Sequence, residues 1–246
     1  MAGAGAALTD ATVGLLAAGK AGDPNGYSAF LADMFNRYTG LSIVRVPIGA
    51  TDFSTDLYTL ADAVPTANAT SDPVTAIAQS FSSARLLSGP VPLLQDILAV
   101  RSDLKVMLSP WSAPPWSKQN QAFSGGWLLT GFENAYGEYL AQTVSAYQSA
   151  GINIYGLTVQ NEPSFAASYP STRLTSTQQN MVAGYLKNRL QALGYGSIQV
   201  RTSPFPPLQV HAPDCVLLSH LRCSLTMTTL INGLLLATQS SPTRPT

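Results

Sequence analysis

Charged residues are scarce in this sequence, and neither sign is in excess. Lysine and arginine together number 13, aspartate and glutamate together also number 13, and charged residues make up only 11% of the 246 positions. Without a basic surplus to neutralise phosphates, a nucleic-acid partner is not expected. Hydrophobic residues reach 46% of the sequence, which is typical of a globular chain rather than a disordered one.

Cysteine and long apolar runs are nearly absent as well. The two cysteines, Cys215 and Cys223, fit neither a zinc site nor a disulfide framework, and we predict no metal and no other cofactor. No apolar run of about eighteen residues occurs, so a membrane span is not expected. Residues 1–8 lack the basic start and apolar core of a signal peptide, and none is predicted in this chain. Nothing in the sequence defines an oligomeric state.

The sequence does contain a steady alternation of strand and helix patterns. This alternation predicts a parallel sheet connected by helices, and both a doubly wound sheet and a barrel fit it. No glycine-rich phosphate turn follows the early strands, which argues against dinucleotide binding. Because the strands are apolar along their whole length, we expect both of their faces to be covered. Strands are predicted at 1–8, 42–49, 105–111, 153–160 and 197–201, and helices at 10–18, 27–38, 93–100, 132–150 and 175–193.

Several polar residues are explained first as helix ends. Asp10 is interpreted as the N-cap of the first helix. Ser176 and Thr177 are candidate caps of the last helix, which Gly194 is predicted to end. These residues therefore need no catalytic explanation.

Polar and aromatic residues follow three of the predicted strands at their carboxyl ends. Asp52 comes after the strand at 42–49, Trp111 and then Trp116 come after the next strand, and Glu162 comes after the third. Barrel enzymes place their active sites at this end of the sheet. The sequence therefore predicts a shared site there.

Glu162 has the setting of a catalytic acid. Glycosidic cleavage requires a carboxyl group that protonates the leaving oxygen and a second carboxylate. Asn161 is able to donate to a sugar hydroxyl, and the two tryptophans offer faces for a sugar ring. The simpler alternatives are a solvated glutamate and packing tryptophans. For Arg45, which lies inside a strand, an ion pair with Asp52 is one hypothesis.

Three segments together resemble glycoside hydrolase family 30. They are Ile43 to Ser54, Ser109 to Trp116 and Thr158 to Pro163, and they occur in the family's order. The family includes glucosylceramidases and fungal endo-β-1,6-glucanases, and it implies a retaining (β/α)8 TIM barrel. The resemblance covers residues 2–200.

The resemblance also implies roles for individual residues. Glu162 matches the general acid/base, and Asn161 matches the residue that binds the hydroxyl beside the reacting carbon. Arg45 is implied to lie beneath the carboxylates. Asp52, Trp111 and Tyr169 match residues that hold the sugar in the innermost subsite.

The sequence also departs from the family pattern. The family's nucleophile is a second glutamate on a late strand, but only Glu133, Glu138 and Glu162 occur, and the first two fall in the helix at 132–150. No nucleophile is placed. Strand–helix alternation stops near residue 201, so residues 1–201 are predicted to form an incomplete barrel of about five strands. Residues 202–246 are interpreted as a divergent or disordered tail, from a frameshift, a retained intron or a genuine divergent end.

Three functions remain open from the sequence. The first is a retaining β-glycosidase acting on β-1,6-glucan, extracellular as in the family, with this chain inactive as it stands. The second keeps the fold and takes glucosylceramide as substrate. The third is a sugar-binding remnant without catalysis.

Overall fold

The computed structural model describes residues 4–63 and 72–202. The prediction for the tail therefore lies outside the described residues, except for Thr202. In the described part, five strands form one sheet in the order β1-β2-β3-β4-β5, and each neighbouring pair is parallel. The strands are β1 Gly5–Ala7, β2 Ile43–Ile48, β3 Lys105–Pro110, β4 Ile154–Thr158 and β5 Gln199–Arg201.

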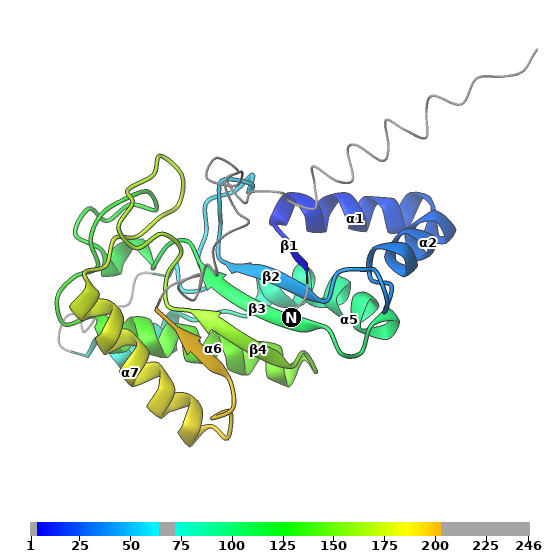
Figure 1. The fold of residues 1–246 in the computed structure, drawn as a ribbon. Helices are drawn as coiled ribbons and strands as arrows, with labels where there is room; N and C mark the ends of the chain where they lie inside the picture. Colours follow the sequence, from blue (N-terminus) through cyan, green and yellow to red (C-terminus); the bar gives the residue numbers. More distant parts are fainter. Residues whose placement is uncertain (1–3, 64–71, 203–246) are drawn as a thin grey trace, which may run out of the picture.

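Helices connect successive strands, as the alternation predicted (Figure 1). The incomplete α/β barrel is thereby confirmed, and the doubly wound alternative is discarded because sequence neighbours are also sheet neighbours throughout. The helices are α1 Asp10–Gly22, α2 Pro24–Met34, α3 Pro73–Ser80, α4 Ala84–Ser88, α5 Pro90–Val100, α6 Glu133–Ser149 and α7 Ser176–Ala192, with a 3-10 turn, η1, at Pro115–Ser117. No helix of the described residues is long and apolar enough to cross a membrane.

The register of the sheet brings the carboxyl ends of β2, β3 and β4 together. Ile48 pairs with Pro110 at the end of β2 and β3. Three residues beyond the end of β4, the Asn161 amide donates to the Pro110 carbonyl at 2.8 Å. The loops that follow β3 and β4 lie at the upper left of Figure 1. Residues distant in sequence therefore lie together at the carboxyl edge of the sheet.

The core lies between the sheet and the helices. On α6 the stripe of Tyr136, Leu140, Val144 and Tyr147 is fully buried, and α6 packs against α3 and α7. Strands covered on both faces were expected; in β2 and β3 burial alternates between partial and complete along the first four residues. Arg45 is among the partly buried residues of β2.

The helix ends correct two expectations. Thr9, not Asp10, is the N-cap of α1, and the Asp10 carboxylate accepts from Ser54 and Tyr58 instead. For α7 the cap is Thr175, which forms a capping box with Gln178. A cap needs extended backbone, which Thr9 and Thr175 have.

The predicted end of α7 agrees with the structure, but two helices were not predicted. Gly194 adopts φ +82° just beyond α7, as its predicted role in ending the helix requires. Helices α3 and α4 were missed. Asp72-Pro73, an N-cap followed by proline in the first turn, was the available signal for α3.

Candidate active site

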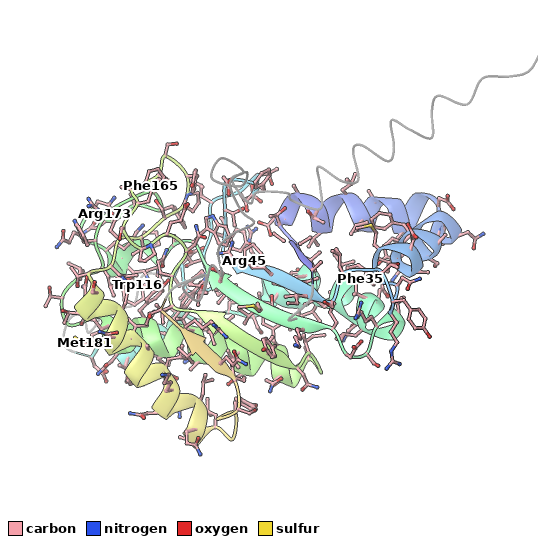
Figure 2. The ribbon with its side chains drawn as sticks, viewed as in Figure 1. Phe35, Arg45, Trp116, Phe165, Arg173 and Met181 are labelled. Carbon is pink, nitrogen blue, oxygen red and sulfur yellow. The ribbon has the colours of Figure 1, made fainter. Side chains whose placement is uncertain are left out.

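Arg45 is the centre of the polar cluster at the carboxyl ends. Its Nη2 donates to Ser109 Oγ and to Asn161 Oδ1, both at 2.7 Å. Its guanidinium lies over the Trp111 ring, 4.4 Å from the ring centroid. One side chain of β2 therefore joins residues of β3 and of the segment after β4; Figure 2 labels Arg45 beside the end of β2.

The charge of Arg45 is balanced at a distance. Burial lowers the pKa of Arg45 to about 10, while the nearby carboxylates of Glu162 and Asp52 act in the opposite direction. The hypothesis of a direct ion pair with Asp52 was wrong, because no contact within 4 Å joins them among the described residues. Asp52 is exposed on the loop after β2, whereas the Arg45 donors point to neutral oxygens.

The Arg45 contact fixes the orientation of the Asn161 amide. A guanidinium only donates hydrogen bonds, so the oxygen of Asn161 must face it. The amide nitrogen then points to the other side, 3.4 Å from Glu162 Oε2. That nitrogen is left as a donor beside the Glu162 carboxylate.

Glu162 stands on a strained turn in the segment that follows β4. Its φ is 46°, in the left-handed region that costs a residue with a side chain about 1 kcal/mol or more. Its carbonyl accepts from the Phe165 amide at 2.9 Å, and its exposed carboxylate accepts from the Tyr169 hydroxyl at 3.2 Å. Such outliers concentrate at functional sites.

A buried polar chain lies behind these residues, and sequence reasoning missed it. The Tyr136 hydroxyl of α6 donates to Gln160 Oε1 at 2.7 Å, and Gln160 Nε2 donates to the Trp111 carbonyl at 2.7 Å. Gln160 is fully buried. A glutamine beside Asn161-Glu162 was a visible signal, but nothing in the sequence pointed to Tyr136.

The two tryptophans have different surroundings. Trp111 is 8% exposed, and Arg45 covers one of its faces. Trp116 packs edge-on against Phe132 and donates from Nε1 to the Ala61 carbonyl at 2.8 Å, so packing accounts for it. The structure thus brings Arg45, Trp111, Asn161, Glu162 and Tyr169 together, with Asp52 at the distance of a charge interaction.

The other two glutamates are used in helix packing. Glu133 accepts from Gln178, and Glu138 accepts from Tyr185 and Arg189, so both link α6 to α7. This agrees with their predicted place in the helix after β3. Within residues 4–63 and 72–202, no group of three His, Cys, Asp or Glu side chains is placed to hold a metal ion.

An exposed carboxylate, an oriented amide and a tyrosine lie at the carboxyl ends of the strands, where α/β-barrel enzymes place their active sites. The chain belongs to glycosyl hydrolase family 30, because the model of that family's TIM-barrel domain matches residues 1–191. The resemblance of the three sequence segments is thereby confirmed.

Relatives with assigned names fall into two groups. The chain is 28% identical to endo-1,6-beta-D-glucanase neg1 of Aspergillus fumigatus, covering 78% of this chain and 41% of that protein. It is 30% identical to endo-1,6-beta-D-glucanase BGN16.3 of Trichoderma harzianum, covering 78% of this chain and 40% of that protein. The mouse lysosomal acid glucosylceramidase is 29% identical, covering 65% of this chain and 30% of that protein. The chain therefore spans less than half the length of these relatives.

Solved structures agree on the fold. The endo-beta1,6-glucanase BT3312 superposes with a TM-score of 0.70 at 27% identity, over 81% of this chain and 43% of that one. SrfJ from Salmonella typhimurium superposes with a TM-score of 0.71 at 24% identity, over 81% of this chain and 43% of that one. This second similarity concerns the fold alone.

Proposed function

We propose that this chain contributes the acid/base half of a retaining β-glycosidase site, with Glu162 as general acid/base. The single observation that supports this most is the Arg45–Asn161 hydrogen bond of 2.7 Å. It turns the amide nitrogen of Asn161 toward Glu162, so a donor for a sugar hydroxyl stands beside a carboxyl group at the carboxyl ends of the strands.

The proposed chemistry uses Glu162 twice. In the first step its carboxyl group protonates the leaving oxygen, and in the second its carboxylate takes a proton from the attacking water. Asn161 donates to the hydroxyl beside the reacting carbon, and Arg45 supplies the positive charge beneath the site. Tyr169 and Asp52 are proposed to contact the sugar, with Trp111 forming the wall behind Arg45.

The second carboxylate is the missing component. Retaining enzymes need it roughly 5 Å from the acid/base, and Glu133 and Glu138 are engaged between α6 and α7. We therefore propose that a polypeptide of these 246 residues does not turn over substrate by itself. The nucleophile would have to come from the later strands of a completed barrel.

For the substrate we propose β-1,6-glucan. Two named endo-1,6-beta-D-glucanases each cover 78% of the chain, more than the 65% covered by the mouse glucosylceramidase. A wall glucan lies outside the cell, so an extracellular location is part of this proposal. Glucosylceramide is the second candidate, favoured by the shared family and by that relative.

The test is a barrel completed with a relative's later strands. Residues 1–201 are joined to the remaining part of the Trichoderma harzianum endo-1,6-beta-D-glucanase, and we call the product the completed protein. It is expected to hydrolyse β-1,6-glucan with retention of anomeric configuration, whereas the 246-residue chain matches its own Glu162→Gln variant. A folded but inactive completed protein would favour the sugar-binding remnant, and cleavage of glucosylceramide alone would favour the second candidate.

The matched controls concern the role of Glu162. In the completed protein, Glu162→Ala should slow hydrolysis about 10²- to 10⁴-fold for poor leaving groups, which need protonation most. Azide should restore part of the second step by replacing base-activated water. A variant that retains full activity on β-1,6-glucan would refute the assignment.

A further inference from the structure

Two loops at the carboxyl ends of the sheet are joined into one body. The β3–α6 loop covers residues 111–132, and the β4–α7 loop covers residues 159–175. The Ser171 amide donates to the Phe123 carbonyl at 3.0 Å, and the Gly125 amide donates to Ser171 Oγ at 2.8 Å. In Figure 1 these loops are the green and yellow-green traces that lie side by side.

The ammonium group of Lys118 lies at this junction. Its side chain is fully buried, and Nζ contacts four oxygens that we call the ammonium cage. They are Ser112 Oγ at 3.0 Å and the carbonyls of Phe123, Gly125 and Ser171 at 2.8, 2.9 and 2.9 Å. Three belong to the β3–α6 loop, and the fourth belongs to the β4–α7 loop.

The cage differs from an ordinary buried ion pair. All four oxygens are neutral, so within the described part of the chain no carboxylate offsets the loss of water around the ammonium. Accordingly, burial lowers the pKa of Lys118 to about 7. A leucine or methionine would fill the same space without this cost, which indicates that the directed hydrogen bonds themselves are required.

A short path leads from the cage to Glu162. Ser171, whose carbonyl belongs to the cage, donates from its hydroxyl to the Tyr169 carbonyl at 3.1 Å. The Tyr169 hydroxyl contacts Glu162 Oε2 at 3.2 Å. Because Glu162 is exposed, its carboxylate is oriented by few groups, the Asn161 amide nitrogen at 3.4 Å and the Tyr169 hydroxyl, so the position of Tyr169 affects where the carboxylate lies.

We propose that Lys118 is a positioning residue for Glu162: its ammonium ties Ser171 to the β3–α6 loop and thereby sets Tyr169 against the Glu162 carboxylate. The inference rests on the proposed function, since it concerns the orientation of the general acid/base. Lys118 itself touches neither substrate nor reacting atoms in this account.

The test uses the 246-residue chain and reads orientation directly. The sequence contains only three glutamates, so carbon-13 labelling of glutamate carboxyl groups gives three NMR signals, and Glu162→Gln assigns the relevant one. Spectra are recorded at about pH 6, where Lys118 is charged. Lys118→Met and Tyr169→Phe should move the Glu162 signal in the same direction, and the double variant should move it no further than either alone.

The matched control is Arg101→Met, which removes a buried cation at the opposite end of the sheet. It should lower stability and leave the Glu162 signal in place. An unmoved Glu162 signal in folded Lys118→Met, or equal movement in Arg101→Met, would overturn the proposal. If Lys118→Met does not fold, Ser112→Ala removes one cage oxygen and should move the signal in the same direction; no movement there would overturn it as well.

Chemical rescue provides an independent measurement. Lys118→Ala leaves space for the missing atoms, and propylammonium has their size, charge and N–H donors. Propylammonium should return the Glu162 signal toward its wild-type position, whereas tetramethylammonium, which has no N–H, should not. Equal effects of both cations, or none from either on the folded variant, would overturn the proposal.

These outcomes separate the two proposals. The NMR signal reports where the Glu162 carboxylate lies and requires no turnover. An inactive completed protein would remove the proposed function while the signal still moved, and an unmoved signal would remove the positioning role while hydrolysis persisted.

Discussion

The two ends of the sheet each contain a buried cation, and they differ in what that cation joins. At the amino end, Arg101 Nη1 donates to the carbonyls of Asn36, Gly40 and Leu41, and its Nε donates to Asp103 at 3.2 Å. At the carboxyl end, Lys118 contacts four neutral oxygens. Among residues 4–63 and 72–202, Arg101 therefore has a countercharge and Lys118 has none.

The segments around these cations explain the contrast. At the amino end, the turn at residues 101–104 and the segment at 35–42 are compact connections from a helix to a strand. At the carboxyl end, the longer loops 111–132 and 159–175 carry Trp111, Tyr169 and Glu162. In barrel enzymes one end supports stability and the other carries chemistry. The comparison indicates that the same device, a cation among carbonyls, serves packing at one end and the site at the other.

The largest expected effect tests whether chemistry belongs to the carboxyl end alone. In the completed protein, Arg45→Met removes the donor that orients Asn161 and the positive charge beneath the site, so kcat/KM should fall about 10²-fold or more. Lys105→Met is the control, because Lys105 begins β3 and lies over the Tyr155 ring. Equal kcat/KM values for both variants on an aryl β-glucoside would contradict the assignment.

The next effect concerns stability at the amino end. Arg101→Met leaves three carbonyls without their donor, and the free energy of unfolding should fall by about 1–3 kcal/mol. Urea unfolding of the 246-residue chain measures this. The kcat/KM of the completed protein should not change at a temperature where both forms are folded; a drop comparable to that of Arg45→Met would break the comparison.

A smaller effect distinguishes the two cations by pH. The folded pKa of Lys118 lies near 7, below its ordinary value of 10.5, so between these values the unfolded chain binds more protons than the folded one. Stability should therefore rise with pH relative to Lys118→Met, by up to about 1.4 kcal/mol per pH unit. Urea unfolding of both proteins from pH 6 to about pH 9 measures the difference, and a difference constant with pH would be inconsistent with a lowered pKa.

The smallest effect shows that not every contact at the carboxyl end serves the site. Thr175→Ala removes the capping box of α7 and should lower the unfolding free energy by about 1 kcal/mol. Thermal unfolding monitors the loss. The carbon-13 signal of Glu162 should stay where it is, because the cap faces α7 and not the cage; a moved signal would show that the loop is less independent than we infer.

The sequence alone predicted much of the fold. Strands β2 to β5 and helices α5 to α7 were found because apolar periodicity and turn residues mark them. Helix α3 was missed because only Asp72-Pro73 indicates where it begins. Asp10 was misread, since a carboxylate at a helix start has two explanations, and only the approach of Ser54 and Tyr58 distinguishes them.

The sequence by itself also predicted which strand ends lie side by side. Right-handed crossovers in a parallel sheet bring successive strand ends to one edge, so residues after β2, β3 and β4 had to meet. Their partners were decided only by the tertiary structure. Arg45 contacts Asn161, 116 positions away, rather than nearby Asp52, and the cage around Lys118 needs a carbonyl 53 positions away. Hydrogen bonds depend on distances of a few tenths of an ångström, and sequence patterns fix which edge a residue occupies but not those distances.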